Sequence, residues 1–411
     1  MSDLRQTTLR SEIEFLVGFP FKSTGYTSEG VRLLRGDNIS QGTLTWSDAK
    51  KWPKSDLEKF KTYELQEGDI VIAMDRPWID AGLKYATITE QDLPCLLVQR
   101  TARLRGGKNL DTKYLKYVIG SPEFTKYVKY ITTGSLVPHI SGDQIKDFCV
   151  SLPSLNTQEK VSEVLFCLDK KIECNNLINA KLEAMAKLLY DYWFVQFDYP
   201  DANGKPYKSS GGKMVYNPEL KRDIPEGWQN KQLGQIANIT MGSSPVGESL
   251  NDECEGVEFF QGSTDFGWRF PSVRQYTKKP VRMARQGDVL LSVRAPVGDL
   301  NLANIDCCIG RGLAALHSKD GFDGFLFYVM QYFKTIFDRR NSEGTTFGSI
   351  TKDDLHSLAL AYPPSDLLQK YNDVVSRYNS MIFVRSREID QLTKLRDWLL
   401  PLLMNGQVTV E

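Results

Sequence analysis

The segment GDVLLSVRAPVGD at residues 287–299 closely follows an earlier segment of the same chain, GDIVIAMDRPWID at residues 68–80. The glycine, the aspartate and the proline recur 219 residues apart, and three or four apolar residues follow each aspartate. A Gly-Asp turn, an apolar run and a proline that interrupts strand hydrogen bonding predict a short buried β-strand. We therefore expect both segments to be core strands of two similar domains.

Two further pairs of segments extend the repeat. GSLVPHISGDQIKDFCVSLP (134–153) resembles GTTFGSITKDDLHSLALAYP (344–363), and VRLLRGDNISQG (31–42) resembles VEFFQGSTDFG (257–267). The first of these two pairs matches at Gly134 and Gly344, Ile140 and Ile350, and Pro153 and Pro363. The order is the same in both halves while the offset changes, which indicates a duplication with loop insertions.

Each half has the same expected plan of short strands, an apolar helix and a long helix. The apolar helices are YLKYVIGSPEFTKYV (114–128) and FLFYVMQYFKTIFDRR (325–340). This plan predicts an α/β (α+β) fold with two similar globular domains. The segment between the halves, residues 198–228, is rich in Gly, Ser, Pro, Lys and Asn and is predicted to be an irregular linker.

The two long helices carry apolar residues at alternating spacings of four and three, which is typical of a coiled-coil seam. Pro401 and Gly406 are expected to end the second helix. Two such seams are expected to pack on each other antiparallel, with Asn175, Asn179 and Arg385 fixing the register. About 35 residues at roughly 1.5 Å each form a rod of about 50 Å, or about 15 base pairs of duplex. The residues assigned to the coiled coil are Leu165, Leu168, Ile172, Leu182, Leu189, Ile382, Ile389, Leu392 and Leu399.

Composition narrows the class of protein. The chain has 411 residues, of which 41% are apolar and 25% charged, and its formal net charge is zero. No signal peptide or membrane span is recognisable, so a cytoplasmic protein without a membrane partner is expected. The seven cysteines include no CxxC pair and only three histidines accompany them, which argues against a zinc site or a disulfide framework.

Motifs for catalysis are weak. GSSPVGES (242–249) has the glycine spacing of a phosphate loop, but Glu248 stands where a lysine would neutralise phosphate. GRGLAA (310–315) resembles part of a dinucleotide-binding motif but lacks the matching acidic residue and the alternating βαβ series around it. We assign no catalytic residue and no metal ligand, and a binding protein is favoured over an enzyme.

A local basic region favours nucleic-acid binding. Residues 269–294 hold seven Arg and Lys residues against one acid, Asp288, with aromatic residues interleaved. Such side chains suit phosphate neutralisation and hydrogen bonding to base edges. The predicted DNA contacts are Arg35, Asn38, Gln41, Arg76, Arg103 and Arg105 in the first half and Gln261, Thr264, Trp268, Arg269, Arg274, Lys278, Lys279 and Arg294 in the second.

Several segments together resemble the specificity subunit of type I restriction-modification systems. These are GDVLLSVRAPVG before IGRG (309–312), the helix entries ISGDQIKDFCVSLPSLNTQEK (140–160) and ITKDDLHSLALAYPP (350–364), and GKPYKSSGGKMVYNPELKRDIPEGW (204–228). The similarity spans nearly the whole chain and rests on the arrangement rather than on one motif.

The resemblance implies two target recognition domains that each read one part of a split DNA sequence. It also implies conserved antiparallel helices that act as a ruler and as the docking site for two modification subunits. Those partners are adenine-N6 methyltransferases that use S-adenosylmethionine, and restriction subunits that use ATP and Mg²⁺ are expected to join them. The chain itself is expected to hold no cofactor and to bind double-stranded DNA.

The resulting domain boundaries are 1–155 and 231–364 for the recognition domains, 156–198 and 365–411 for the spacer helices and 199–230 for the linker. Met74-Asp75-Arg76 stands where the second half has Val293-Arg294-Ala295, so the two halves should read different sequences. Two alternatives stay open: a stand-alone DNA-binding adaptor without a methyltransferase, and an enzyme that acts on nucleic acid by itself.

Overall fold

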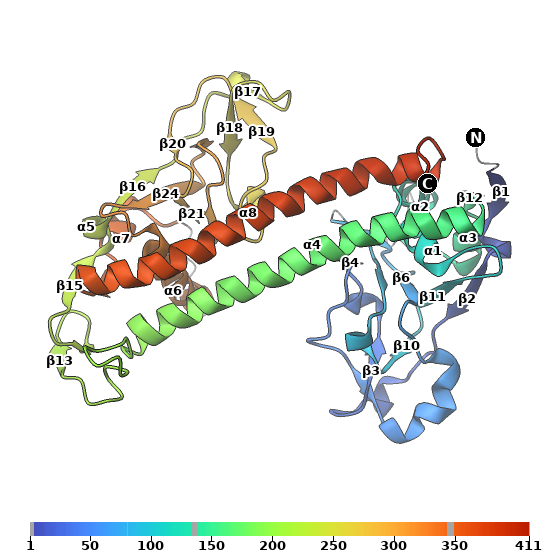
Figure 1. The fold of residues 1–411 in the computed structure, drawn as a ribbon, viewed down its shortest axis with the longest axis horizontal. Helices are drawn as coiled ribbons and strands as arrows, with labels where there is room; N and C mark the ends of the chain where they lie inside the picture. Colours follow the sequence, from blue (N-terminus) through green and yellow to red (C-terminus); the bar gives the residue numbers. More distant parts are fainter. Residues whose placement is uncertain (1–3, 80, 133–137, 343–348, 411) are drawn as a thin grey trace. The chain divides into compact units, whose positions relative to one another are not determined.

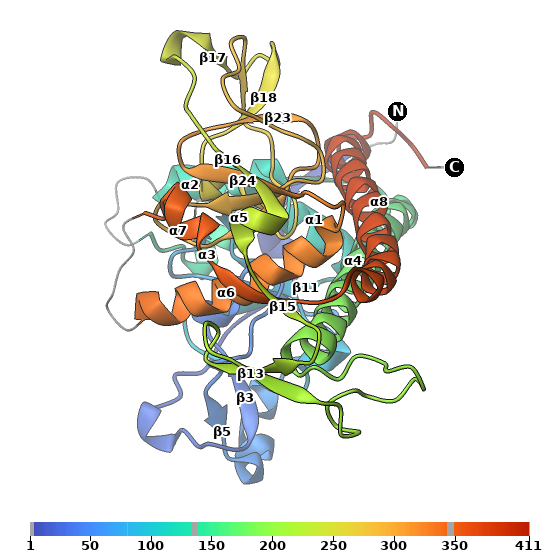
Figure 2. The same cartoon turned by 90° about the vertical axis from the view of Figure 1, so that its left-hand side faces the viewer.

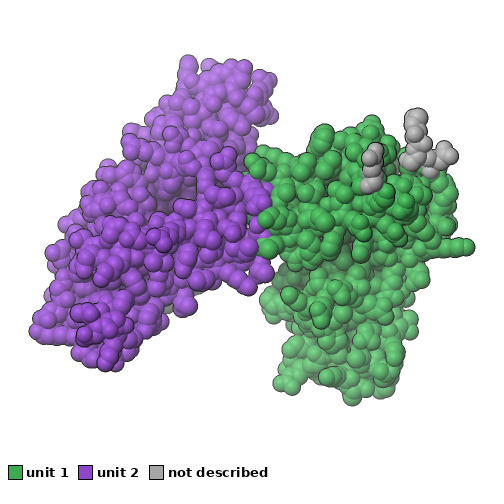
Figure 3. Space-filling model, in the orientation of Figure 1, with its two compact units in different colours: residues 1–174, 389–411 green, residues 175–388 purple. Residues whose placement is uncertain are grey.

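The computed structural model describes residues 4–79, 81–132, 138–342 and 349–410. The chain divides into two compact units. Unit 1 comprises Met1–Cys174 and Ile389–Glu411, and unit 2 comprises Asn175–Glu388 (Figure 3). Asp80, Gly134 and Gly344 of the repeated segments lie outside the described residues.

Unit 1 is a mixed α+β domain with small helices. Its helices are α1 (Thr112–Ile119), α2 (Pro122–Thr132) and α3 (Gly142–Lys146), and a 3-10 segment covers Lys54–Tyr63. Its strands are β1 (Arg5–Thr8), β2 (Ile13–Val17), β3 (Val31–Leu34), β4 (Gln41–Gly42), β5 (Lys51–Trp52), β6 (Ile70–Ala73), β7 (Trp78–Ile79), β8 (Gly82–Leu83), β9 (Tyr85–Thr87), β10 (Cys95–Leu97), β11 (Thr101–Gly106) and β12 (Cys149–Leu152).

Unit 2 has the corresponding elements. Its helices are α5 (Leu233–Ile236), α6 (Asp323–Ser342) and α7 (Lys352–His356). Its strands are β13 (Met214–Asn217), β14 (Arg222–Pro225), β15 (Gln229–Gln232), β16 (Ala237–Met241), β17 (Leu250–Asn251), β18 (Val257–Phe260), β19 (Gln275–Thr277), β20 (Met283–Ala284), β21 (Val289–Ser292), β22 (Leu300–Leu302), β23 (Cys307–Ile309), β24 (Leu313–Ser318) and β25 (Ala359–Tyr362).

The repeated Gly-Asp segments that begin at Gly68 and Gly287 contain the interior strands β6 and β21, as predicted. In unit 1 the sheet order is β2-β11-β6-β9-β4, and in unit 2 it is β16-β24-β21-β22. All four residues of β6 and all four of β21 are buried. Apolar side chains on both faces of a strand require cover on both sides, so each strand lies at the centre of its domain.

The remaining sheets confirm the duplication. A short parallel pair, β3 with β10, occurs in unit 1, and its counterpart in unit 2 is β18 with β23. The antiparallel pair of β1 and β12 likewise corresponds to β15 and β25. The two halves of the chain therefore share one topology, although the spacing between equivalent segments is 219 residues for one pair and 210 for another.

The predicted apolar helices differ between the halves. In unit 2 the prediction is confirmed as one helix, α6, which lies between the sheet and the long helices (Figure 2). In unit 1 the expected single helix is two helices, because Gly120 and Ser121 end α1 and Pro122 begins α2. Proline has no backbone N–H and fits the first turn of a helix but not its interior.

The two long helices are α4 (Leu155–Tyr190), followed by a π-helical turn at Asp191–Val195, and α8 (Ser365–Met404). We call α4 and α8 the helix pair (Figure 1). Each of the two helices contributes residues to both units. Pro401 lies inside α8 rather than at its end, contrary to the prediction. Helix α8 ends at Met404, and Gly406 follows with φ of 71°.

Two hydrogen bonds across the helix pair establish the relative direction of its helices. In unit 2, Asn175 Nδ2 donates to Glu388 Oε2 at 2.9 Å and Asn179 Nδ2 donates to Ser386 Oγ at 3.2 Å. The partner number falls as the residue number on α4 rises, so the helices are antiparallel. The predicted seam is confirmed, since its residues are buried or half-buried: Leu165, Leu168, Ile172, Leu182, Leu189, Ile382, Ile389, Leu392 and Leu399.

The second half of the predicted irregular linker is an ordered hairpin of β13 and β14, whereas residues 201–213 consist mainly of turns and bends, as predicted. Strand β13 pairs antiparallel with β14, and the hairpin stands clear of the sheets in Figure 2. The ring of Tyr199 stacks on Tyr207 at 4.8 Å and on Trp228 at 5.5 Å. These aromatic contacts supply the apolar cover that a two-stranded hairpin needs for stability.

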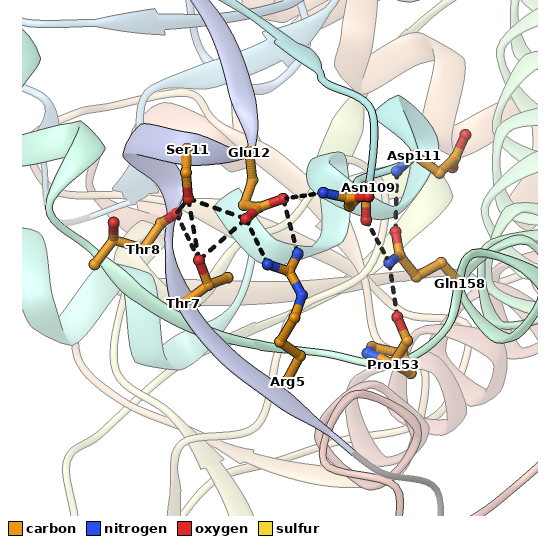
Figure 4. Close-up of polar contacts among 9 residues, drawn as sticks. All are labelled: Arg5, Thr7, Thr8, Ser11, Glu12, Asn109, Asp111, Pro153 and Gln158. Carbon is orange, nitrogen blue, oxygen red and sulfur yellow. Dashed lines mark hydrogen bonds and ion pairs between the residues drawn. The ribbon is translucent and has the colours of Figure 1, made fainter.

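A buried carboxylate holds the start of unit 1 together (Figure 4). Both oxygens of Glu12 pair with the Arg5 guanidinium at 2.9 Å, and Thr7 and Ser11 also donate to Oε1. Asn109 donates to Oε2 at 3.4 Å, and the Asn109 carbonyl accepts a bond from Gln158 on α4. This network connects β1, the loop before α1 and the first turns of α4.

The Glu12 network predicts acid sensitivity. Hydrogen bonds from Arg5 lower the pKa of Glu12 to about 2, against the opposing effect of burial. A carboxylate whose pKa is depressed on folding stabilises the fold above its unfolded pKa and loses that contribution as pH falls through the folded value. Glu12→Gln is therefore expected to lower the free energy of unfolding at pH 7, and the gap to wild type should narrow between about pH 5 and pH 2.

Urea unfolding of both proteins across this pH range measures the gap. Glu29→Gln, which removes an exposed carboxylate of the same unit, serves as the control and should leave stability nearly unchanged. A gap that stays constant with pH would assign the stability of this network to packing rather than to charge.

Candidate nucleic-acid interface

Unit 1 has an open pocket of about 390 Å³ where several loops meet at the end of the buried strand β6. Two of its cations, Arg35 and Arg76, were predicted DNA contacts, Arg100 was recognised in the sequence as part of a basic run with Arg103 and Arg105, and Lys84 was missed. The remaining lining residues are Tyr26, Gly36, Asp37, Asp75, Val98 and Gln99. The pocket thus places four cations and two carboxylates around one concave surface.

Asp75 organises one side of this pocket. Its Oδ2 accepts a hydrogen bond from Arg100 Nη1 at 2.8 Å, and its Oδ1 lies 2.6 Å from His139 Nδ1. The backbone of His139 also pairs with that of Asp75. The carboxylate therefore holds the Arg100 guanidinium in a defined orientation at the edge of the pocket.

Arg76 and Lys84 form the other side. Within the described residues, neither side chain has an ion-pair partner. Burial and the nearby charge of Arg76 lower the pKa of Lys84, while Asp37 acts in the opposite direction. Two neighbouring cations without a carboxylate partner suit a ligand that supplies acceptor oxygens or nitrogens.

Backbone strain also gathers at this pocket. Arg76 has φ of 45° and Arg100 has φ of 65°, both in the left-handed region that non-glycine residues rarely adopt. These left-handed conformations could not be predicted from the sequence, because arginine has no preference for positive φ angles. Strained residues of this kind cluster at functional sites.

Other predicted contacts of the first half lie in structural positions. Asn38 is buried, accepting from the Arg35 backbone N–H at 3.0 Å and donating to the Thr45 carbonyl at 3.0 Å. Arg105 forms a two-point ion pair with the buried Asp69. These placements do not fit direct DNA contacts, because both side chains already satisfy the protein's own polar groups.

The remaining first-half candidates are half-buried. Gln41 Nε2 donates to the Gly82 carbonyl at 3.4 Å. Arg103 points from β11 with its Nε buried, and burial lowers the pKa of this guanidinium. Neither residue lines the pocket of unit 1, so their DNA-contact roles stay predictions.

In unit 2 the loop after β18 exposes several predicted residues together. Gln261, Thr264 and Trp268 are exposed, and the buried Asp265 holds their turn by accepting the Gln261 backbone N–H at 2.8 Å. Arg274 is exposed and donates from Nε to Asp265 at 2.9 Å. The loop therefore presents an amide, a hydroxyl, an indole and a guanidinium from one ordered turn.

Arg269 lies in the same loop but points inward. Its side chain is 1% exposed, Nη1 donates to Glu183 of α4 at 3.0 Å, and Nη2 donates to Asn379 of α8 at 2.7 Å. The guanidinium also stands 4.1 Å from the ring centroid of Phe327. The prediction that Arg269 contacts DNA is therefore wrong. Arg269 instead connects the loop to both helices of the helix pair by hydrogen bonds.

The other cations of the second half are accessible. Lys278 is exposed and pairs with Glu255, while Lys279 and Arg294 are exposed. The backbone of Arg294 forms a β-bridge with Ser349 directly after β21. These side chains are free to face a polyanion, and their DNA contacts stay predictions.

The seam residues are buried or half-buried in the helix pair, and the docking role predicted for them stays a prediction. Apolar side chains that do reach the surface of α4 and α8 include Leu177, Met185, Leu188, Leu395 and Trp398. The sequence analysis missed them because they fall between the seam positions.

The described residues offer little for metal or membrane chemistry. Throughout residues 4–79, 81–132, 138–342 and 349–410, no three His, Cys, Asp or Glu side chains gather closely enough to hold a metal ion. The cysteines are free thiols. None of the described helices has the length and apolar character needed to span a membrane.

Comparisons with known proteins agree with the duplicated fold. The family model described as the type I restriction modification DNA specificity domain matches residues 5–184 and again residues 225–394. A Methanocaldococcus jannaschii protein with the provisional name type I restriction enzyme MjaX specificity subunit is 32% identical over 314 residues, which cover 75% of this chain and 71% of that protein.

Two further relatives add detail. The type I restriction enzyme EcoAI specificity subunit of Escherichia coli is 39% identical over 171 residues, which cover 41% of this chain and 28% of that protein. The crystal structure of the type I restriction-modification system S subunit from M. genitalium has a TM-score of 0.63 at 14% identity, covering 98% of this chain and 96% of that one. At this identity the structural likeness concerns the fold alone.

The position of Arg269 predicts a structural role that is measurable. Arg269→Ala leaves Glu183 without its buried partner, and loss of one member of such a pair costs about 3–5 kcal/mol. Thermal unfolding of the full chain should therefore show a marked decrease in stability. The exposed Lys279→Ala in the same domain should be nearly neutral. Normal stability with weakened DNA binding in Arg269→Ala would return this residue to the DNA contacts.

Proposed function

The chain belongs to the family of type I restriction-modification DNA specificity subunits, and on this premise we propose that it reads an asymmetric DNA target in two parts. Unit 1 would read one half-site and unit 2 the other. The observation that carries this proposal is the duplication of one topology with different polar side chains in the two copies. Copies with the same side chains would favour a symmetric target instead.

The reading surfaces we propose are the pocket of unit 1 and the loop after β18 in unit 2. Both surfaces combine cations with amide, hydroxyl or carboxylate groups. Cations alone would serve phosphate contacts, whereas mixed donors and acceptors suit the edges of base pairs in the major groove. A chain with zero formal charge can bind DNA through such local surfaces.

In this proposal the chain is not itself an enzyme. Modification subunits would transfer the methyl group of S-adenosylmethionine to adenine N6, and restriction subunits would use ATP and Mg²⁺ for cleavage. These partners and cofactors rest on the family and on the resemblance of the sequence. The cytoplasmic location expected from the sequence stays a prediction.

Equivalent apolar positions on the helix pair support docking of two modification subunits. Met185 and Leu188 on α4 are 51% and 67% exposed, and the residues 210 positions later on α8, Leu395 and Trp398, are 42% and 62% exposed. The first pair belongs to unit 2 and the second to unit 1. Large exposed apolar side chains at repeat-equivalent positions are expected where two copies of one partner bind.

Substitution of these residues tests the docking. Leu188→Glu and Trp398→Glu should each reduce the number of modification subunits bound from two to one, and the double variant should bind none. A buried charge without a partner is strongly unfavourable at an apolar interface. Native mass spectrometry of the assembled complex counts the subunits.

Val215→Glu, on the exposed surface of the β13 hairpin, is the matched control and should leave two subunits bound. Full assembly by the Leu188→Glu, Trp398→Glu double variant would show that docking uses another face.

The proposed function as a whole is tested by a map of N6-methyladenine in cells with and without this gene. Loss of methylation at one split, asymmetric motif is the expected result. Methylation or cleavage by the isolated chain would instead support an enzyme. An unchanged map, in cells whose modification subunit is expressed, would support the stand-alone adaptor.

A further inference from the structure

The two units share a backbone frame at the end of their central strand. Met74 N donates to the Arg100 carbonyl at 2.9 Å, and Val293 N donates to the Gly312 carbonyl at 2.9 Å. Since Met74 and Val293 follow β6 and β21 at the same position, Arg100 and Gly312 are structurally equivalent.

Two more hydrogen bonds extend the frame. Ala73 N donates to the Lys84 carbonyl at 3.0 Å, as Ser292 N donates to the Asp299 carbonyl at 2.8 Å. The helix entries close the frame in the same way, because Ile140 N and Ile350 N each donate to the residue after the central strand at 2.9 Å. The positions that this frame makes equivalent are Arg35 and Gln261, Asp75 and Arg294, Arg76 and Ala295, Lys84 and Asp299, and Arg100 and Gly312.

The side chains on this common frame have opposite chemistry. Unit 1 carries four cations and one carboxylate at these positions, whereas unit 2 has a single cation, Arg294, where unit 1 has its carboxylate, Asp75. Lys84 is replaced by the acid Asp299. The backbone hydrogen bonds are kept although every side chain differs, so the fold does not require these side chains.

A site for DNA phosphate would not tolerate this exchange. Every phosphate carries the same charge, so both copies would need cations at the same positions. A site for base edges must instead differ between domains that read different sequences, since each base pair presents its own pattern of donors and acceptors. The reversal of charge on a constant frame is the pattern expected for base reading.

We infer that these five positions, which we call the reading cradle, determine the sequence of each half-site. This inference rests on the proposed function and deepens it. In unit 1, Arg76 donates two hydrogen bonds to the acceptor edge of a guanine, and Arg100, held by Asp75, borders the same site. In unit 2, Arg294 and Gln261 take over the reading.

The geometry of Arg76 supports its place at the centre of the cradle. Its guanidinium is exposed and without an ion-pair partner among the described residues, while its backbone N–H donates to the Pro138 carbonyl at 2.7 Å. A left-handed conformation is sterically unfavourable in a non-glycine residue. The surrounding hydrogen bonds hold the residue in this conformation, which directs a rigid fork of donors out of the domain.

The test uses the complete complex of this chain with its modification subunits and a library of DNA targets randomised in each half-site. Arg76→Lys keeps the charge but loses the two-point fork, so preference at one position of the first half-site should fall by roughly 10- to 100-fold. The second half-site should be unchanged and is the internal control. Arg294→Ala should produce the reverse pattern, with loss confined to the second half-site.

Arg76→Asn is the control for folding, because asparagine tolerates the left-handed region better than most residues. This variant should unfold at the wild-type temperature and should still lose the sequence preference at the same DNA position. Lys59→Ala removes a similar exposed charge from unit 1 outside the cradle and should leave the preference intact.

The outcomes separate the inference from the function on which it rests. A wild-type complex without any sequence preference would contradict the proposed function itself. A wild-type complex with two half-sites, combined with an Arg76→Lys variant of unchanged preference, would overturn the reading cradle. Uniform weakening across all sequences, with a salt dependence reduced by about one phosphate, would make Arg76 a phosphate contact instead.

Discussion

The antiparallel seam of α4 and α8 is the constraint on which both units depend. Unit 1 closes its core with two separate stretches of the chain, and unit 2 closes its core with both ends of one continuous stretch. In unit 1, Leu165 of α4 and Leu400 of α8 belong to the same buried cluster as the sheet residues. In unit 2, Tyr190 and Tyr371 do the same with α6. The seam therefore joins chain segments about 200 residues apart, and each domain folds against both helices.

Polar residues in the seam define its register. A purely apolar seam would permit neighbouring registers of similar energy, whereas Asn175 and Asn179 find their partners only in the observed one. Charged pairs then tie each domain to the seam. Asp169 of α4 accepts from Lys116 at 2.6 Å in unit 1, and Glu183 of the same helix accepts from Arg269 at 3.0 Å in unit 2. Each domain is thus joined to α4 by an ion pair, but the residues that form the pair differ between the domains.

This division of labour separates stability from recognition. Buried strands, seam residues and junction ion pairs occupy positions where substitution would leave a cavity or an unpaired charge. The reading cradle lies beyond the end of the central strand, where the backbone is held by its own hydrogen bonds. Sequence preference can change at such positions without a change of fold, as expected for sites carried on loops of a rigid scaffold.

The amino-acid sequence by itself determined the duplication, the buried strands β6 and β21, the seam of the long helices and the family. These features can be recognised from the sequence because burial imposes a periodic pattern of apolar residues and because the pattern occurs twice. The tertiary structure decided which polar side chains face outward. Arg269 and Arg76 are both basic residues in loops. Arg269 is buried in an ion pair with Glu183, whereas Arg76 has a left-handed backbone and an exposed side chain. That distinction depends on contacts between distant segments and on backbone angles, neither of which a pattern of residues records.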